Sequence, residues 1–319
     1  MNIRNVRRVA VFGAGTMGSG IAQVFAAAGY KVVLYDTNPQ AFQRATSIIK
    51  TNLETLIEHG LVQENLVDAV LDNIQTTLSL EEAAADADIA LECIVEKLEV
   101  KKELFYSIDK MCPERTIFAS NTSYLNIFQV VPPRRLPNTA IAHWFAPAHI
   151  IPLVEVVRGD ETKIETIQFL TELVKHIGKI PVVLEKYLPG FCINRIQRII
   201  GREIFFLLDN GYITPQELDL AVKASIIPRS MVLGMVQRYD FTGLDLSAMN
   251  LENEDYLEAP FDNKPKSLIE RVEKGDLGVK TGRGFYDYTG RKYEEVLKER
   301  DAQLLKVFNN LKEQIYKTI

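Results

Sequence analysis

An apolar run that ends in three glycines constrains the fold of this chain more than any other stretch. Residues 8–12 have the composition of a buried strand, and Gly13, Gly15 and Gly18 follow with G-x-G-x-x-G spacing. Apolar side chains then recur at helical spacing as far as Ala28. The glycines therefore lie at a strand-to-helix turn, where the first permits the tight turn, the second lets a pyrophosphate approach and the third lets helix and strand pack closely. The pattern predicts a dinucleotide cradle.

A second strand, expected over residues 31–35, ends in Asp36. An acidic residue about 20 positions after the glycines accepts hydrogen bonds from the adenosine ribose hydroxyls and repels a 2′-phosphate. No Lys or Arg follows Asp36 before Arg44. A lone G-x-G-x-x-G also occurs in ordinary glycine-rich turns, but here strand, glycines, helix, strand and acid follow in order. The sequence therefore predicts NAD, rather than NADP, as the cofactor.

Strands and helices continue to alternate along the first part of the chain. Strands are expected over residues 89–94, 116–120 and 180–184, and helices over 79–85, 100–111 and 164–178. Such alternation is typical of a doubly wound parallel sheet, whereas the residues after 186 keep helical spacing alone. We therefore expect an α/β Rossmann-type N-terminal domain over 1–186, an all-α C-terminal domain over 187–288 and a C-terminal helical extension over 289–319.

Composition excludes several classes of partner. The 319 residues are 47% hydrophobic and 25% charged, with a net charge of −5, so no broad basic surface for nucleic acid or an anionic membrane is expected. No apolar run approaches the ~20 residues of a membrane span, and the N-terminus runs almost directly into the first strand, which leaves no room for a signal peptide. Cys93, Cys112 and Cys192 lack metal-site spacing. We expect reduced, mostly buried thiols, no metal site and a cytoplasmic protein.

Two strand-like segments, residues 140–147 and 152–157, flank His149 and are joined by a short connection. If they pair as an antiparallel hairpin centred on His149, then His143 and Glu155 face each other with Cβ atoms ~5 Å apart. A structural role is the ordinary explanation for a single histidine. We expect it for His59, His149 and His176, with a place in the lining of the cleft as the alternative for His149. A carboxylate opposite His143 instead favours a general base held by an orienting acid.

Polar residues follow two of the expected strands at their carboxyl ends, where open α/β sheets bind their ligands. The first cluster is Val95-Glu96-Lys97, and the second is Asn121-Thr122-Ser123. Asn194 lies in the first turn of the first helix beyond the predicted domain boundary. Asparagine is common near helix starts, so this position leaves both a structural and a functional role open.

The chain resembles the L-3-hydroxyacyl-CoA dehydrogenase family over essentially its whole length to Tyr288. The matching segments are Gly13–Gly18, Ile94–Lys101, Ser120–Ser123, His143 with Glu155, Pro189–Phe191 with Asn194-Arg195, and Lys280–Tyr286. The resemblance implies an NAD-binding α/β domain followed by a helical domain that supplies part of the cleft and the interface of a homodimer.

The resemblance also implies roles for individual residues. In this family the residue matching His143 is the catalytic base, the residue matching Glu155 orients it, and those matching Ser123 and Asn194 bind the substrate oxygen. The implied cofactor contacts are Gly13, Gly15, Thr16, Met17, Gly18, Asp36, Glu96, Lys101, Asn121, Ser123 and Lys280. The expected reaction is the reversible oxidation of a secondary alcohol to a ketone, in which His143 takes the hydroxyl proton as hydride leaves for NAD.

Departures from the family bear on the small-molecule substrate. CoA-dependent members usually carry lysines in the helical segment after the second strand, but residues 51–72 hold only acidic charges here, and Arg44 and Lys50 are the nearby cations. Phosphates without compensating cations are poorly held. Ala146 also replaces the asparagine that usually follows the catalytic histidine by three residues.

The charged helical tail expected over residues 293–317 is the third departure. It is similar to the tails of L-carnitine dehydrogenase and L-gulonate 3-dehydrogenase, and either completes a dimer interface or contacts substrate. The run His149–Pro152 resembles a pyridine-carboxylate dehydrogenase of vitamin B6 breakdown. An L-3-hydroxyacyl-CoA is the first substrate expected, and a free hydroxycarboxylic acid is the alternative. A third possibility, an NAD-binding structural or sensing protein, does not need the set Ser123, His143, Glu155 and Asn194.

Overall fold

The computed structural model describes residues 3–255, 257–311 and 313–316. The chain divides into two compact units, Met1–Arg195 and Ile196–Ile319. The sequence-based boundaries at residues 186 and 288 stay predictions.

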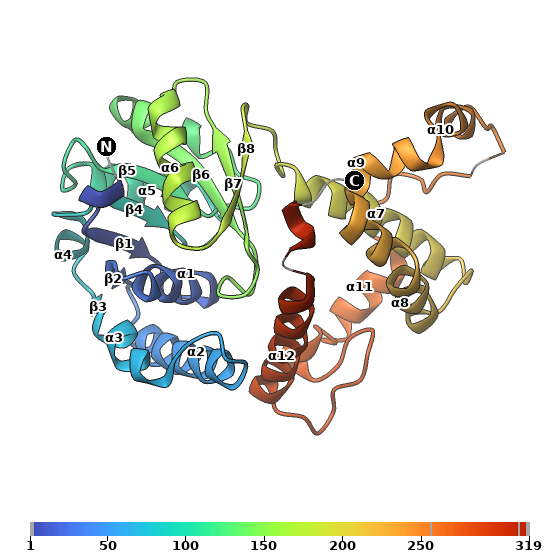
Figure 1. Cartoon of the computed structure of the whole chain (residues 1–319), viewed down its shortest axis with the longest axis horizontal. Helices are drawn as coiled ribbons and strands as arrows, with labels where there is room; N and C mark the ends of the chain where they lie inside the picture. The colour runs from blue at the N-terminus through green and yellow to red at the C-terminus, as the bar shows by residue number, and fades with distance from the viewer. Residues whose placement is uncertain (1–2, 256, 312, 317–319) are drawn as a thin grey trace. The chain divides into compact units, whose positions relative to one another are not determined.

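The first unit is built on one eight-stranded sheet in the order β3-β2-β1-β4-β5-β6-β7-β8 (Figure 1). Its strands are β1 (Arg8–Phe12), β2 (Lys31–Tyr35), β3 (Ile74–Thr77), β4 (Ile89–Glu92), β5 (Ile117–Ser120), β6 (Thr139–Trp144), β7 (Leu153–Arg158) and β8 (Ile180–Leu184). All neighbouring pairs are parallel except β6 and β7, which are antiparallel. The predicted Rossmann-type sheet is confirmed.

Helices cover both faces of this sheet. They are α1 (Thr16–Ala27), α2 (Pro39–Glu58), α3 (Val67–Asp72), α4 (Leu80–Ala84), α5 (Leu98–Asp109) and α6 (Ile164–His176). Short 3₁₀ helices are η1 (Ile3–Asn5), η2 (Glu64–Leu66), η3 (Ile127–Gln129) and η4 (Pro133–Asn138). Alternate residues of β1 belong to opposite cores: Val9 and Val11 pack with α1, α2 and α6, whereas Ala10 and Phe12 pack with α4 and α5. Strand β1 is thus buried on both faces, as the central strands of doubly wound proteins are.

The structure differs from the sequence-based expectation in one edge strand and in the burial of the cysteines. The edge strand β3 was not expected, because the run Ile74–Thr77 carries three polar residues and two of its four side chains are exposed. The cysteines are free thiols, but only Cys112 is buried; Cys93 is half-buried and Cys192 is exposed, so the expectation of mostly buried thiols was wrong.

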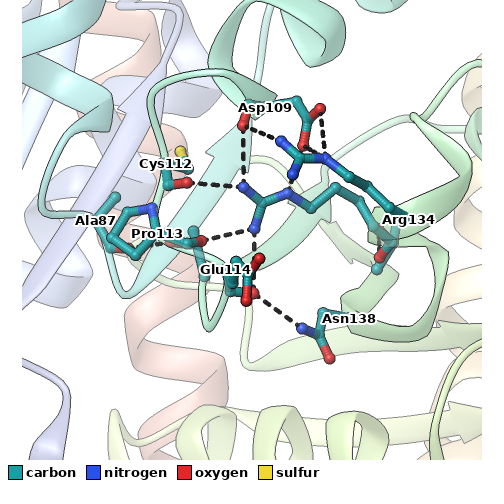
Figure 2. Close-up of polar contacts among 10 residues, drawn as sticks. Ala87, Asp109, Cys112, Pro113, Glu114, Arg134 and Asn138 are labelled. Carbon is teal, nitrogen blue, oxygen red and sulfur yellow. Dashed lines mark hydrogen bonds and ion pairs between the residues drawn. The ribbon is translucent and has the colours of Figure 1, made fainter.

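A buried arginine ties the end of α5 to the segment that leads into β6 (Figure 2). Arg135 is 3% exposed and donates to Asp109 Oδ1 at 2.6 Å and to the carbonyl oxygens of Cys112 and Pro113 at 2.8 and 2.6 Å. Its neighbour Arg134 binds the same carboxylate at 3.0 Å. Burial alone would raise the pKa of Asp109, but the hydrogen bonds from both guanidinium groups lower it. The cluster anchors η4, from which β6 continues directly.

The second unit is helical. Its elements are α7 (Ile193–Asp209, beginning in the first unit), α8 (Pro215–Ala224), α9 (Ile226–Thr242), α10 (Leu244–Leu251), α11 (Lys266–Glu273), η5 (Val279–Thr281), α12 (Tyr293–Leu311) and η6 (Gln314–Tyr316). Helix α9 is kinked at Gly234, whose φ is 70°. The all-α C-terminal region is confirmed, and the tail is helical over Tyr293–Leu311. Residues 312 and 317 of the expected tail helix lie outside the described residues.

Helices α7 to α11 contain no buried residue. Val236 is 82% exposed and Leu251 is 85% exposed.

No helix in the described part of the chain is both long and apolar enough to cross a membrane.

Candidate active site

The glycine turn has the shape that the motif predicts. Gly13 has a φ of 107° and donates its N–H to the carbonyl oxygen of Tyr35 at 2.8 Å. A Cβ added at Gly18 would lie 1.8 Å from the carbonyl oxygen of Gly13, so helix α1 and the turn approach closer than any side chain permits. At Gly15 a Cβ would meet nothing within 4 Å. Helix α1 is therefore in close contact with the turn at Gly18, whereas the space beside Gly15 is free.

The open side of the turn leads into a cavity. Helix α1 begins after Gly15 without a side-chain cap, so the N–H groups of its first turn, which includes Thr16 and Met17, are not held by a capping side chain. The cavity has a volume of about 460 Å³ and is lined by residues of β2, α4 and α5 and of the loops that follow β1, β2 and β4, among them Gly13, Gly15, Tyr35, Asp36, Cys93 and Val95. Free helix N–H groups beside an open glycine fit a pyrophosphate.

Asp36 lines this cavity at the carboxyl end of β2. Its Oδ2 accepts a hydrogen bond from the N–H of Ala14 at 2.8 Å, and its Oδ1 accepts one from Asn38 at 2.9 Å. A carboxylate has about four acceptor positions, so Asp36 keeps the capacity to accept ribose hydroxyls as well. The two backbone contacts fix its orientation relative to the glycine turn.

A buried ion cluster joins the carboxyl ends of β4 and β5. Lys101 is 1% exposed, and its Nζ lies 2.6 Å from Glu92 Oε1 and 3.0 Å from Glu96 Oε2. Glu92 is fully buried and also accepts hydrogen bonds from Ser120 Oγ at 2.5 Å and the N–H of Ile94 at 2.8 Å. Lys101 is therefore an internal ion-pair partner in this structure.

The same cluster orients the loop after β5. Glu96 Oε1 accepts hydrogen bonds from Thr122 Oγ1 at 2.5 Å and from the N–H of Ser123 at 2.7 Å. Burial alone would raise the pKa of Glu96, but the Thr122 hydrogen bond, the Lys101 charge and the Ser123 N–H lower it. Burial raises the pKa of Glu92, against the opposing effect of Lys101. Glu96 is thus held as a charged acceptor that positions Ser123.

His143 and Glu155 lie opposite each other on β6 and β7, as the hairpin geometry predicted. His143 Nδ1 is 2.8 Å from Glu155 Oε2, and the two side chains are 5% and 0% exposed. With Nδ1–H donating to the carboxylate, Nε2 carries the lone pair and accepts a proton. The rings of Phe145 and Phe191 lie 4.5 and 5.3 Å from the imidazole and pack around it.

The second oxygen of Glu155 is also held. Glu155 Oε1 accepts hydrogen bonds from the backbone N–H groups of Cys192 and Ile193, both at 3.0 Å. These groups belong to the start of α7, whose dipole favours a negative charge there. The turn that presents them has Phe191 at a φ of 52°, a left-handed conformation that a bulky residue rarely adopts. Phe191 is fully buried, which holds this turn in place.

The remaining predicted substrate-binding residues meet beside this pair. Asn194 Nδ2 donates to the backbone carbonyl of Ser123 at 3.2 Å, so the two residues expected to bind the substrate oxygen are adjacent. Asn121 Oδ1 accepts from the N–H of Trp144, the residue after His143, at 2.8 Å. The structure thus brings together the ends of β4, β5 and β6 and the first turn of α7.

Two further positions were singled out from the sequence. Lys280 lies in η5 of the second unit. Ala146 is exposed and precedes a cis peptide bond to Pro147.

Sequence reasoning missed Glu92, which joins Lys101, Ser120 and Ile94 in one cluster. The signal was available, because Glu92 is the one charged residue in the apolar run from Ile89 to Ile94. A carboxylate in a buried strand needs a partner.

Comparison with known proteins agrees with this geometry. Residues 8–187 match the NAD-binding domain of 3-hydroxyacyl-CoA dehydrogenase, and residues 190–288 match its C-terminal domain. The chain is 36% identical over 287 residues to a probable 3-hydroxybutyryl-CoA dehydrogenase of Bacillus subtilis, covering 89% of this chain and 98% of that one. It is 32% identical over 305 residues to the 5-formyl-3-hydroxy-2-methylpyridine 4-carboxylate 5-dehydrogenase of Mesorhizobium japonicum, covering 95% of this chain and 97% of that one.

A solved structure agrees as well. That of a 5-formyl-3-hydroxy-2-methylpyridine 4-carboxylic acid 5-dehydrogenase, described as an NAD⁺-dependent dismutase, superimposes with a TM-score of 0.86 at 29% identity, covering 96% of this chain and 99% of that one. Since both domains of the family match and the glycine turn, Asp36 and the cavity beside them fit its cofactor, the chain belongs to the NAD-dependent oxidoreductases of the 3-hydroxyacyl-CoA dehydrogenase family.

Proposed function

We propose that this protein oxidises the secondary alcohol of an L-3-hydroxyacyl-CoA to the ketone, reversibly and with NAD. The observation that carries the proposal is the 2.8 Å contact between His143 Nδ1 and Glu155 Oε2, which leaves His143 Nε2 as a proton acceptor. A binding protein needs no base with an orienting carboxylate, so this contact favours an enzyme over a sensing or structural protein.

The proposed proton path runs through this pair. His143 Nε2 takes the hydroxyl proton of the substrate, and Glu155 stabilises the imidazolium that forms. The amides of Cys192 and Ile193 hold the carboxylate in place, so it does not rotate as the charge develops. Bound NAD supplies the acceptor for the hydride.

Ser123 and Asn194 are proposed to hold the substrate oxygen. Their adjacency and the Glu96 contact to the Ser123 N–H support a fixed oxygen-binding position. For the cofactor we propose contacts from the residues of the glycine turn, Gly13, Gly15, Thr16, Met17 and Gly18, and from Asp36, Glu96, Lys101, Asn121, Ser123 and Lys280. Lys101 would act there mainly by fixing Glu96, because its ammonium group already binds two carboxylates.

A panel of CoA thioester and free-acid alcohols tests the proposed substrate. The value of kcat/KM for (S)-3-hydroxybutyryl-CoA is compared with those for free 3-hydroxy acids and for the free acid of the same acyl chain. We expect the thioester to be preferred by at least about 10-fold, since binding energy from the remote CoA moiety raises kcat/KM. Equal values with and without CoA would contradict the first choice of substrate.

A free hydroxycarboxylic acid is the second candidate, favoured by two observations. The Mesorhizobium relative aligns over 305 residues, more than reach Tyr288, so its similarity extends into the C-terminal tail. Helix α2 and the residues after it carry five acidic side chains over 51–72 and only Arg44 and Lys50 as nearby cations. Free 3-hydroxy acids and hydroxypyridine carboxylates in the same panel would identify this class.

We further propose a homodimer that forms through the C-terminal region, in a cytoplasmic enzyme. The support for the dimer is the lack of buried residues in α7 to α11 beside large exposed apolar side chains such as Val236 and Leu251. Apolar surface of that extent is usually covered by a partner. Light scattering after size-exclusion chromatography should give twice the chain mass, and Val236→Glu should lower it. A monomer at micromolar concentration would contradict the proposal.

A further inference from the structure

A buried lysine, Lys179, binds the loop that joins the strands of His143 and Glu155. Lys179, between α6 and β8, is 7% exposed. Its Nζ donates to the carbonyl oxygens of Ala148 and Ile151 at 2.6 and 2.9 Å. Among the residues that the structure describes, no Asp or Glu lies within ion-pair distance of it.

The charge on Lys179 is unfavourable for the fold. Burial lowers the pKa of Lys179 to about 8. The titratable side chains that line the same cavity of about 360 Å³ are His149 from the hairpin loop and His176 from α6. A neutral residue of the same length would avoid the desolvation of an ammonium group. The two carbonyl contacts of Lys179, rather than a gain in stability from its charge, therefore point to its role.

The carbonyls that Lys179 binds belong to the loop that joins the two strands of the active site. We define the hairpin loop as residues 145–152; it connects β6, which carries His143, to β7, which carries Glu155. Within it, the Pro147 carbonyl accepts hydrogen bonds from the N–H groups of Ile150 and Ile151, both at 3.0 Å. Lys179 thus binds a compact turn at two points.

The hairpin loop also contacts the dinucleotide-binding helix. The Cβ of Ala148 lies 3.3 Å from the position that a Cβ at Gly20 of α1 would occupy. Ala148 is 3% exposed, so it is enclosed between α1 and the Lys179 ammonium. Lys179 therefore fixes one loop that contacts α1 and continues into both strands of the catalytic pair.

We propose that Lys179 is a positioning residue of the active site, whose ammonium group fixes the hairpin loop and thereby the His143–Glu155 pair relative to α1. The inference rests on the proposed function, in which that pair performs the proton transfer. A charged donor binds two carbonyls more strongly than a neutral amine, so loss of the Lys179 proton loosens the loop. The enzyme then loses turnover as Lys179 deprotonates, although the fold becomes more stable.

One tryptophan provides a probe that is independent of any substrate. Trp144 is the single tryptophan of the chain, and Lys179 Nζ lies 6.0 Å from the centre of its ring. An ammonium group at that distance perturbs the indole, and its loss changes the emission. We expect the Trp144 emission of the full chain to change with a midpoint near pH 8, since the pKa of Lys179 is about 8. This change in Trp144 emission should be absent in Lys179→Met. It should remain in Lys175→Met, which removes an exposed lysine four positions away.

Kinetics with (S)-3-hydroxybutyryl-CoA and NAD between pH 7 and 10 test the positioning role. At pH 7, Lys179→Met should lower kcat by about 10-fold or more, because small misplacements of reacting groups cost up to about 100-fold. The Kd of NADH should change by less than about 3-fold. Wild-type kcat should fall above pH 8, a decline that is absent in Lys179→Met and that Lys179→Arg moves beyond pH 10 with partial rescue of kcat.

The outcomes separate this inference from the proposed function. A wild-type chain that oxidises no alcohol in the panel refutes the proposed function, and the Trp144 titration then decides whether the ammonium group holds the loop. An active wild type with unchanged kcat in Lys179→Met, or with the same alkaline decline in that variant, overturns the positioning role. If Lys179→Met does not fold, Lys179→Arg and the wild-type titration give the same decision.

Discussion

Glu155 Oε2 lies 2.8 Å from His143 Nδ1, across an antiparallel pair in a sheet whose other neighbouring strands are all parallel. Directly opposed residues on antiparallel strands have their Cβ atoms at the separation that such a contact needs. The antiparallel pairing of β6 and β7 therefore provides the rigid support for the proposed base.

Removal of the base gives the first prediction. His143→Ala should lower kcat by at least about 10²-fold, the lower bound for general-base catalysis. The Kd of NADH, measured by fluorescence titration, should stay within about 3-fold, because the glycine turn is unchanged. His59→Ala is the matched control, since His59 lies at the end of α2 and contacts the Thr55 carbonyl. Near-wild-type turnover in His143→Ala would refute the assignment.

Two alanine substitutions in the glycine turn should differ in effect. Gly15 has a φ of −73° and open space around it, so Gly15→Ala should fold normally and weaken NADH binding by about 10-fold or more where the pyrophosphate approaches. Gly18→Ala places a Cβ 1.8 Å from the Gly13 carbonyl oxygen and should lower the melting temperature as well. Calorimetry and NADH titration check both; unchanged NADH affinity in Gly15→Ala would contradict the proposed cradle.

The buried cluster under Ser123 gives a stability prediction. Lys101→Met leaves Glu92 and Glu96 without their shared cation and should reduce the free energy of unfolding by about 3–5 kcal/mol. Lys102→Met, which removes an exposed neighbour, should change it by less than about 0.5 kcal/mol. Urea denaturation of both variants measures the difference, and equal effects would show that the cluster contributes nothing specific.

The pH dependence of stability follows from Lys179. Its folded pKa of about 8 lies below the ordinary value of 10.5, so between these pH values the unfolded chain binds more protons than the folded one. The free energy of unfolding therefore rises with pH across this window, by at most roughly 3 kcal/mol. Comparing wild type with Lys179→Met by urea denaturation at pH 7 and 9.5 isolates this contribution. A gain in stability that persists in the variant would assign it to other groups.

The sequence indicated those parts of the fold that depend on local pattern. The glycine turn, Asp36 and the facing of His143 and Glu155 follow from spacing and strand periodicity, and the structure contains each of them. Strand β3 was missed because an edge strand with one exposed side carries no continuous apolar run. The positions of Glu92 and Lys179 were missed because burial of a charged side chain is decided by residues distant in sequence, and no short window contains them.

The antiparallel hairpin has a consequence for how the chain assembles. His143 and Glu155 are 12 residues apart, whereas the β1 and β4 ends joined through Asp88 and Arg8 are 80 apart. Closing the shorter loop costs about 1.7 kcal/mol less chain entropy. The catalytic pair thus depends on contacts that form locally, whereas the nucleotide cradle requires strands from distant parts of the chain to meet. Insertions between β2 and β4 would therefore raise the entropic cost of assembling the cradle and leave the cost of assembling the pair unchanged.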